Sequence, residues 1–543
     1  MNRSYLRAAL LLCCTLFFTT VLMAQYAGQD VLRYDFSIAI NDSTDQIEGV
    51  ARIDIALTGE QKRIKLDLVE EQKGKGMRIK RIEVNGQKAD YAHAGELLSI
   101  VLPSGNEQGD SVMVEVQYEG IPANGLIISK SKHGKRTFFG DNWPNRAHHW
   151  LPVVDHPADK AYVTWRVYAP DHYQVIANGA EKQRDMLPAS KQVHYVYSSR
   201  VPLPTKVMVF GAADFATDQS GVLGEGNAIP VTSWVYEEEK KDGFYDYALA
   251  LPIAAWMQEY IGPYPFSKLA NVQSKTMFGG MENASCIFYH ENSIDGKRGE
   301  ANLFAHEIAH QWFGNSASEA DWPHIWLSEG FATYFTHMYV EQSQGTEAMQ
   351  TGLLQDRQVI LAFSKMNPLR PVVDTAETNL MKLLNPNSYQ KGSWVLHMLR
   401  HRLGDEIFQK AVRTYYERYT LSNATSHDFQ QVVEEVSGKD LGTFFNQWLR
   451  WPGVPEIEGT WKCKGKKLTI SFKQLQPQGV YELPLDVHIY VEGETEPLKR
   501  QLLLNKKDQT FLQSTQGKKV KQVVLDPNVW MLMKAKLEAK KKK

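Results

Sequence analysis

Cysteine is nearly absent from this chain of 543 residues, which contains only four. Cys13 and Cys14 lie in an apolar N-terminal stretch, so only Cys286 and Cys463 remain beyond it. A single pair this far apart in the sequence is not a disulfide framework. We therefore expect two buried free thiols and a fold that is held together by its hydrophobic cores.

An excess of charge of either sign is also missing, because 61 lysines and arginines stand against 62 aspartates and glutamates. A balanced chain exerts no long-range attraction on a polyanion, and we expect no nucleic-acid partner. The sequence contains no internal repeats, and no low-complexity block apart from a lysine-rich end. Its composition is that of an ordinary globular protein.

Only one long hydrophobic run is present, and it lies at the N-terminus. "MNRSYLR" supplies positive charge, "AALLLCCTLFFTTVLMA" supplies an apolar segment, and Ala24 is a small residue before "QYAGQD". This pattern predicts a signal peptide over residues 1–24 that is cleaved after Ala24. The alternative is an uncleaved anchor, the only case in which we expect membrane contact, since the run approaches the shortest spanning length. N-terminal sequencing of the mature protein decides between them, and a start at Gln25 supports cleavage.

The apolar pattern divides the rest of the chain into three regions. From about Leu32 to Phe215, segments such as "YDFSIAI" and "GVARIDIAL" alternate apolar and polar residues between turn formers, which predicts strands. A Gly-rich connection, "DQSGVLGEGNAIP", leads to segments with helical spacing, among them "NLFAHEIAHQWFG" and "IWLSEGFATYFTHMYVEQ". Strand patterns return after "WLRWPGVPEI".

We therefore expect a multidomain α+β protein. The length by itself suggests about three or four domains. The predicted parts are an N-terminal β-domain of sandwich type over 25–217, a mostly helical domain over 218–452, a small C-terminal β-sandwich over 453–537, and a solvated lysine-rich tail over 538–543.

The stretch "LFAHEIAHQWFGN" carries a candidate metal site. His306 and His310 are four residues apart, which on a helix places both rings on one face, where they can chelate one ion. Glu307 lies beside them and can reach a metal-bound water. The plainer interpretation is a helix with two polar surface histidines, because such a pair also arises by chance.

A third ligand favours the metal site. "WLSEGFATY" places Glu329 on the next predicted helix, 19 positions after His310, and the turn formers between them let the second helix return antiparallel. Two imidazoles and one carboxylate, with water in the fourth position, are typical of catalytic zinc. A structural zinc site would use four protein ligands, usually thiolates.

Upstream lies "MFGGMENASC", whose five residues "GGMEN" we predict to bind substrate. Gly279 and Gly280 permit an extended backbone to approach another chain closely. Glu282 follows Met281 and precedes Asn283, and its carboxylate could pair with the free α-ammonium of a peptide. Taken alone, the segment is more simply a Gly-rich turn with an exposed glutamate.

Together these segments make the chain resemble the gluzincin zinc aminopeptidases, the family of aminopeptidase N and leukotriene A hydrolase. "HEIAHQWFGN" and "WLSEGFATY" match the family's metal motif, and "GGMEN" matches its exopeptidase motif, Gly-(Gly/Ala)-Met-Glu-Asn. The family's catalytic tyrosine lies in a Tyr-x-Lys-Gly segment, which Tyr389 opens here. The resemblance covers nearly the whole mature chain. It implies an N-terminal β saddle, a thermolysin-like catalytic domain and a C-terminal β-sandwich.

The resemblance also implies a mechanism and one Zn²⁺ per chain. Zinc held by His306, His310 and Glu329 would lower the pKa of its water toward neutrality, and Glu307 would act as general base. Tyr389 would donate to the oxyanion of the tetrahedral intermediate. Peptides with a free N-terminus are the implied substrates, because the interior of a peptide would leave a desolvated Glu282 carboxylate unpaired.

The chain departs from the family pattern in the first domain. The family often has Phe-Pro-Cys-Phe-Asp-Glu-Pro where this chain reads "LPVVDHP", so Val153 replaces the cysteine and His156 the glutamate. The wall of the pocket for the first substrate residue falls near "GDNWPNRAHHW", where Asp141 and Asn142 are the candidates. The chain is also too short for the large helical C-terminal domain of longer members, which implies a more open site.

Three other functions remain open. An endopeptidase on the same zinc site would cut amino-blocked peptides, and a non-enzymatic peptide-binding module would hold zinc without turnover. An epoxide hydrolase shares the family. The pattern leaves the oligomeric state undefined.

The predicted signal peptide indicates secretion through the inner membrane, and we expect a periplasmic or extracellular bacterial protein. "NAS" at Asn283 is a glycosylation sequon inside the proposed site, where a glycan would obstruct substrate. The sequon fits a bacterial envelope better than a eukaryotic secretory pathway, and a glycan mapped to Asn283 of active enzyme would contradict this.

Overall fold

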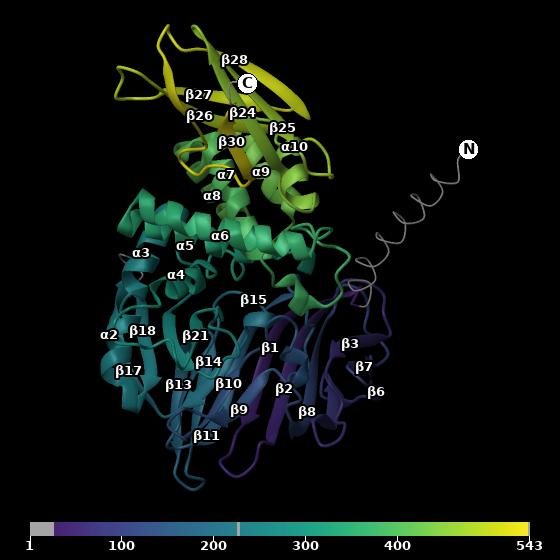
Figure 1. Cartoon of the computed structure of the whole chain (residues 1–543). Helices are drawn as coiled ribbons and strands as arrows, with labels where there is room; N and C mark the ends of the chain where they lie inside the picture. The colour runs from purple at the N-terminus through teal and green to yellow at the C-terminus, as the bar shows by residue number, and fades with distance from the viewer. Residues whose placement is uncertain (1–25, 225–227, 541–543) are drawn as a thin grey trace, which may run out of the picture. The chain divides into compact units, whose positions relative to one another are not determined.

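The structure is a computed structural model that describes residues 26–224 and 228–540 (Figure 1). The predicted signal peptide over 1–24 lies outside the described residues. The chain divides into two compact units, of which the first comprises Met1–Trp322 with Tyr416–Ala424 and the second Pro323–Tyr415 with Thr425–Lys543. Among the residues that the structure describes, no helix is long and apolar enough to cross a membrane.

The first unit opens with an N-terminal β-domain, which confirms the strands predicted there. Its largest sheet has the order β13-β14-β11-β1-β2-β8-β4-β5, with β15 paired to β11, and the long strands β1, β2 and β8 lie side by side in Figure 1. A second sheet has the order β12-β16-β10-β9, and a third β3-β7-β6. The strands are β1 (Gln29–Ala39), β2 (Ile47–Leu57), β3 (Arg63–Asp67), β4 (Gly76–Val84), β5 (Gln87–Lys88), β6 (Tyr91–Ala94), β7 (Leu97–Val101), β8 (Ser111–Ile121), β9 (Leu126–Lys130), β10 (Arg136–Gly140), β11 (Lys160–Pro170), β12 (Gln174–Ala177), β13 (Ala180–Leu187), β14 (Gln192–Ser198), β15 (Leu203–Pro204) and β16 (Phe210–Ala213).

Alternation of apolar side chains explains how these sheets pack. In β1, Tyr34, Phe36 and Ile38 point to one face and are each 0% exposed. Trp165 on β11 and Phe210 on β16 bring two of the sheets together, with ring centroids 5.8 Å apart. The core therefore lies between sheets, as the alternating pattern predicts.

A five-stranded sheet follows, which the sequence pattern did not predict. Its order is β17-β18-β19-β21-β20, and β19 runs parallel to both of its neighbours. All six residues of β19 are buried, so the strand lacks the apolar–polar alternation by which strands are recognised. The strands are β17 (Phe215–Leu223), β18 (Ile229–Tyr236), β19 (Leu269–Ser274), β20 (Gly280–Met281) and β21 (Cys286–His290), and a short pair joins β22 (Ser318–Glu319) to β23 (Asn423–Ala424).

Three helices accompany this sheet: α2 (Lys240–Tyr247), α3 (Ala250–Ile261) and α4 (Ala301–Ala309). The stretch "YDYALALPIAAWMQEYIG", which has helical spacing throughout, is divided between α2 and α3. Pro252 explains the break, because proline lacks an N–H and fits only the first turn of a helix.

Two lysines of the N-terminal β-domain hold the segment that follows α4. The Lys160 ammonium donates to the carbonyls of Ser316 at 2.6 Å and Ser422 at 2.8 Å, and burial lowers the pKa of Lys160 to about 7. Lys206 and Glu319, 1% and 0% exposed, form a buried ion pair. Removing one partner of such a pair would leave an uncompensated buried charge. These contacts therefore hold residues 316–319 firmly against the N-terminal β-domain.

The second unit contains the remaining predicted helices and the C-terminal β-sheets, as expected. Its helices are α5 (Trp326–Gln344), α6 (Thr346–Met366), α7 (Gly392–Leu403), α8 (Asp405–Tyr419, which extends into the first unit), α9 (Ser426–Ser437) and α10 (Gly442–Phe445). Two sheets follow, with orders β28-β25-β24-β30 and β27-β26-β29. Their strands are β24 (Glu456–Lys464), β25 (Lys467–Gln474), β26 (Leu483–Val491), β27 (Leu498–Leu504), β28 (Asp508–Ser514), β29 (Val520–Leu525) and β30 (Lys534–Ala539). Strand β30 thus extends two residues into the expected solvated tail.

Candidate active site

Two histidines one helical turn apart form the centre of the candidate site. His306 lies in the last turn of α4 and His310 caps its C-terminus, with Nε2 atoms 3.1 Å apart. The Nδ1 atom of His310 lies 3.1 Å from the carbonyl oxygen of Phe313. Because a carbonyl only accepts hydrogen bonds, this contact assigns the proton to Nδ1 and leaves a lone pair on Nε2.

The spacing of these nitrogens fits a shared zinc ion. Two nitrogens each about 2.0–2.1 Å from a tetrahedral zinc would lie roughly 3.3–3.4 Å apart, close to the separation seen here. A ring N–H bonded to a backbone carbonyl is also the usual way in which a metal-binding histidine is oriented. The donor chemistry of α4 therefore fits the metal that the sequence predicts.

Glu307 lies directly under the strand that carries the predicted substrate-binding segment. Its side chain is buried, and a Cβ atom added to Gly280 in β20 would overlap the Glu307 carboxylate. A Cβ atom on Gly279 would meet only Leu303, at 3.7 Å, which is an ordinary contact. Of the two glycines, Gly280 is thus the one that permits the close approach in this conformation.

The carboxylates of Glu282 and Glu307 belong to one buried cluster. Ligand atoms of Glu282, Glu307 and His310 all lie within 4.8 Å of one another, and both glutamates are 5% exposed. Two ionised carboxylates this close repel each other, and a nearby cation removes that penalty. The cluster is therefore suited to a positively charged ligand.

Two amides hold Glu282 in place against α4. The side chains of Gln311 and Asn315 donate to the Glu282 carbonyl oxygen at 2.9 and 2.6 Å, and Ser285 N–H donates to Gln311 at 2.9 Å. Gln311 and Asn315 are fully buried. Sequence reasoning assigned them no role, although both stand in the quoted metal motif. Both lie in the turns after α4, where no periodic pattern marks a residue.

Asp141 and Asn142, the candidates for the pocket wall, are both fully buried. Asp141 pairs with Arg146 and accepts from the hydroxyl of Thr276 at 3.2 Å and the backbone N–H of Met277 at 3.0 Å. Asn142 donates to two backbone carbonyls and accepts from an indole N–H. Asp141 therefore anchors the segment that leads into "GGMEN". The side-chain hydrogen bonds of Asn142, in contrast, all lie within the N-terminal domain.

The remaining predicted residues lie in the second unit. Glu329 is in the first turn of α5 and is 4% exposed. Its neighbour Gly330 packs against the backbone of Gly392 at the start of α7, where an added Cβ atom would lie 2.9 Å from the Gly392 Cα and carbonyl carbon. Only glycine allows this approach, which sets α5 beside the segment that carries Tyr389.

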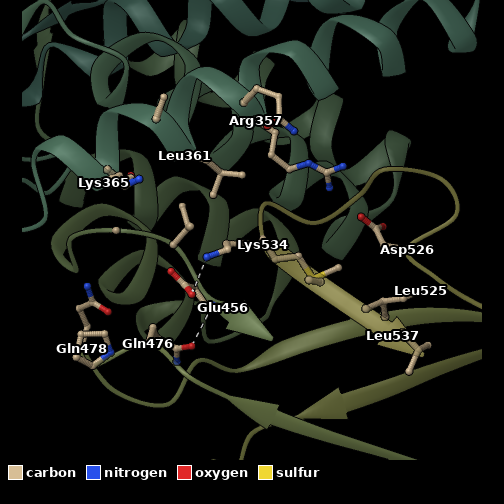
Figure 2. Close-up of a pocket in the computed structure, with 18 of the residues that line it drawn as sticks. Arg357, Leu361, Lys365, Glu456, Gln476, Gln478, Leu525, Asp526, Lys534 and Leu537 are labelled. Atoms are coloured by element: carbon tan, nitrogen blue, oxygen red, sulfur yellow. Dashed lines mark hydrogen bonds and ion pairs between the residues drawn. The ribbon is translucent and has the colours of Figure 1, made fainter. Parts of the chain in front are cut away.

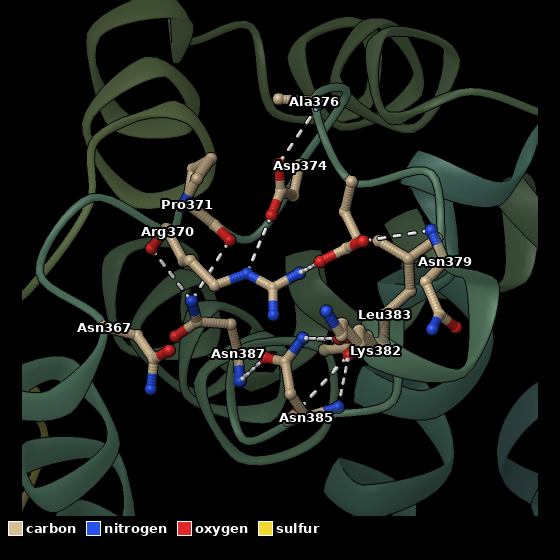
Figure 3. Close-up of polar contacts among 12 residues, drawn as sticks. Asn367, Arg370, Pro371, Asp374, Ala376, Asn379, Lys382, Leu383, Asn385 and Asn387 are labelled. Carbon is tan, nitrogen blue, oxygen red and sulfur yellow. Dashed lines mark hydrogen bonds and ion pairs between the residues drawn. The ribbon is translucent and has the colours of Figure 1, made fainter.

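Tyr389 lies in a π-helical turn, Asn387–Lys391, which is anchored at both ends. At its start, Asn387 donates to the carbonyl of Arg370 at 2.9 Å (Figure 3). At its end, the buried Lys391 ammonium donates to the carbonyl of Gly453 at 2.7 Å, and burial lowers the pKa of Lys391 to about 7. Single π-helical turns often occur at functional sites.

An ion-pair network stabilises the loop before this turn. The Arg370 guanidinium pairs with two carboxylates, Asp374 at 2.9 Å and Glu377 at 3.0 Å. Figure 3 shows Arg370 turned toward Asp374. These ion pairs hold Arg370 in place. Its backbone carbonyl oxygen is therefore well positioned to accept the hydrogen bond from Asn387. Sequence reasoning found Tyr389 but not this support, which no motif marks.

Two models of known protein families match this chain. The family model described as "Peptidase M1 N-terminal domain" matches residues 31–207, and the one described as "Peptidase family M1 domain" matches residues 247–448. The chain therefore belongs to peptidase family M1, the family that its motifs resemble. By residue type, His306, His310 and Glu329 are its candidate His-His-Glu metal ligands.

Individual relatives agree with this family. "Aminopeptidase M1-C" of Oryza sativa subsp. japonica is 30% identical over 350 residues, which cover 61% of this chain and 38% of the relative. This chain thus spans less than half of that relative. The M1 zinc metallopeptidase from Deinococcus radiodurans has a TM-score of 0.67 and 21% identity over 79% of this chain and 95% of its own.

A second solved structure covers more of the fold. The Legionella pneumophila aminopeptidase A in complex with aspartic acid has a TM-score of 0.81 and 16% identity, and the match covers 95% of this chain and 60% of that one. At this identity the likeness supports the fold alone. It confirms the sequence of an N-terminal β-domain, a helical catalytic domain and C-terminal β-sheets.

Proposed function

We propose that this chain is a zinc-dependent aminopeptidase that removes single residues from the free amino end of peptides. One observation carries the proposal: in a family of metallopeptidases, Glu282 and Glu307 share a buried cluster with His310. One carboxylate suffices for a general base. The second, which directly follows strand β20, is explained by a cationic group of the substrate.

We infer that His306, His310 and Glu329 bind one zinc ion per chain. The spacing of the two imidazole nitrogens and the family match support this inference. Bound zinc would supply a Lewis acid and lower the pKa of a water molecule toward neutrality. The buried environment of His310 and Glu329 would exclude competing solvent.

The protein groups then divide the remaining tasks. Glu307 takes a proton from the attacking water and later returns it to the departing amine. The Tyr389 hydroxyl donates to the oxygen on which negative charge develops. The Glu282 carboxylate binds the α-ammonium of the substrate, which fixes the first residue and therefore the bond that is cut.

The charge of Glu282 is what excludes internal cleavage. The interior of a peptide offers no cation, so it would leave a desolvated carboxylate unpaired, at a cost of about 2–5 kcal/mol. A free α-ammonium avoids this cost. The same interaction would reject a peptide whose amino group is acetylated.

One peptide in two forms tests the proposal. The purified protein is incubated with the peptide either free or N-acetylated, and the products are read by mass spectrometry. We expect a ladder of single N-terminal losses from the free form only, and none after a chelator has removed the metal. Internal cuts in both forms would indicate an endopeptidase, and zinc binding without cuts would indicate a binding module.

A further inference from the structure

The second unit contains a cleft of about 1160 Å³ that no part of the proposed mechanism uses (Figure 2). Helix α6 forms one wall, with Arg357, Leu361 and Lys365. Strands β29 and β30 and the start of β24 form the others. The cleft therefore lies between a helix and the two C-terminal sheets, all within one compact unit.

Both of these sheets present an open strand edge to the cleft. Strand β30 pairs only with β24, and the bond from Lys534 N–H to the Pro455 carbonyl sets the register. Alternate residues, Ala535 and Leu537, therefore direct their backbone N–H and C=O groups away from β24. Both residues line the cleft, and among the described residues no second strand pairs with this side of β30.

Strand β29 is the corresponding edge of the other sheet. It pairs only with β26, and the bond from Asp526 N–H to Asp486 O implies that Val523 and Leu525 direct their backbone groups outward. These two residues also line the cleft. Unpaired strand edges are templates for another polypeptide backbone, and natural proteins usually cover or charge them.

The charged side chains that line the cleft indicate what kind of polypeptide would bind there. Arg357 and Lys365 stand two helical turns apart on α6, and neither forms an ion pair with any described residue. The acidic groups are engaged: Glu456 pairs with Lys534 at 3.1 Å, and Asp526 accepts the backbone N–H of Trp530 at 2.7 Å. Asp526 also attracts the Arg357 guanidinium, so the lining keeps an excess of one cation, with three basic side chains against two acidic ones.

We propose that this cleft binds an extended acidic segment of a partner polypeptide, which pairs with the open edge of β30 as an added strand. Side chains of a strand alternate between two faces. One face of the segment would contact the apolar residues Met533 and Leu537, and the face turned toward α6 would place carboxylates near Arg357 and Lys365. Recognition by main-chain pairing with side-chain selection is an established mode of peptide binding.

A blocked peptide of alternating valine and glutamate tests this proposal on the full-length protein. Acetyl and amide ends keep the peptide from being a substrate of an aminopeptidase, so binding is measured separately from turnover. We expect saturable binding by fluorescence anisotropy of a C-terminally labelled peptide. A matched peptide with lysine in place of glutamate should bind at least tenfold more weakly.

Two proline variants test the strand pairing. Ala535→Pro removes an N–H that faces the cleft without removing a bond to β24, and it should weaken binding at least tenfold. Ala539→Pro is the matched control, because it has the same outward register on β30 and does not line the cleft. Both residues are exposed, and both variants should unfold at the temperature of the parent protein.

A charge exchange tests the helical wall independently. Arg357→Glu together with Lys365→Glu should reject the glutamate peptide and accept the lysine peptide. Cleavage of a free dipeptide should be unchanged in every variant, since none of these residues belongs to the candidate active site. No saturable binding of the glutamate peptide, or equal binding by Ala535→Pro and Ala539→Pro, would overturn the proposal.

Discussion

Replacing Glu307 by glutamine should lower kcat by about 10² to 10⁴, the range attributed to a positioned general base. This corresponds to roughly 3–5 kcal/mol of transition-state stabilisation. The substitution keeps the shape of the side chain beneath Gly280, so the backbone of β20 should not move. Steady-state kinetics on a free peptide measures the loss.

Metal analysis separates this effect from loss of the site. Glu307→Gln should retain one zinc ion per chain, because the two imidazoles and Glu329 are untouched. His310→Ala is the comparison variant, and it should lose both zinc and activity. A Glu307→Gln enzyme with kcat within tenfold of the parent would rule out Glu307 as the general base.

Replacing Glu282 by glutamine should abolish the preference for a free amino terminus. Loss of the charge partner of a buried ammonium costs about 2–5 kcal/mol, so kcat/KM for a free peptide should fall by roughly 30-fold to 5,000-fold. Cleavage of the N-acetylated peptide should not fall. The ratio of the two rates, measured on the same sequence, is therefore the informative quantity.

An exposed glutamate supplies the control for this second variant. Glu60 is exposed and forms no ion pair with a described residue, so Glu60→Gln changes the net charge equally. Its ratio of free to acetylated cleavage should match that of the parent. If Glu282→Gln keeps the parent ratio, Glu282 does not bind the amino terminus, and some other group selects the first residue.

Local sequence was sufficient for much of the candidate site. The spacing of His306 and His310 predicts one helical face, and α4 and its cap provide it, because a four-residue step returns to the same side of a helix. The alternating strands of the N-terminal domain were recognised for a similar reason, since each buries a single face. Short sequence motifs likewise identified Glu282, Glu329 and Tyr389 as candidate site residues.

Other features were hidden because they depend on contacts between distant segments. The central strand β19 has buried residues on both faces and therefore no alternation to recognise. The hydrogen bonds from Gln311 and Asn315 to the Glu282 carbonyl join residues about thirty positions apart. Arg370 and its two carboxylates belong to a loop that no periodic pattern marks.

The sequence by itself determined which chemical groups this protein carries and on which elements they stand. It could do so because helix and strand periods, glycine positions and motif spacing are local properties of the chain. Only the tertiary structure decided which groups meet: Gly280 against Glu307, Glu282 within reach of His310, and Asp141 buried with Arg146. Such contacts follow from the packing of whole sheets and helices, and no short stretch of residues encodes them.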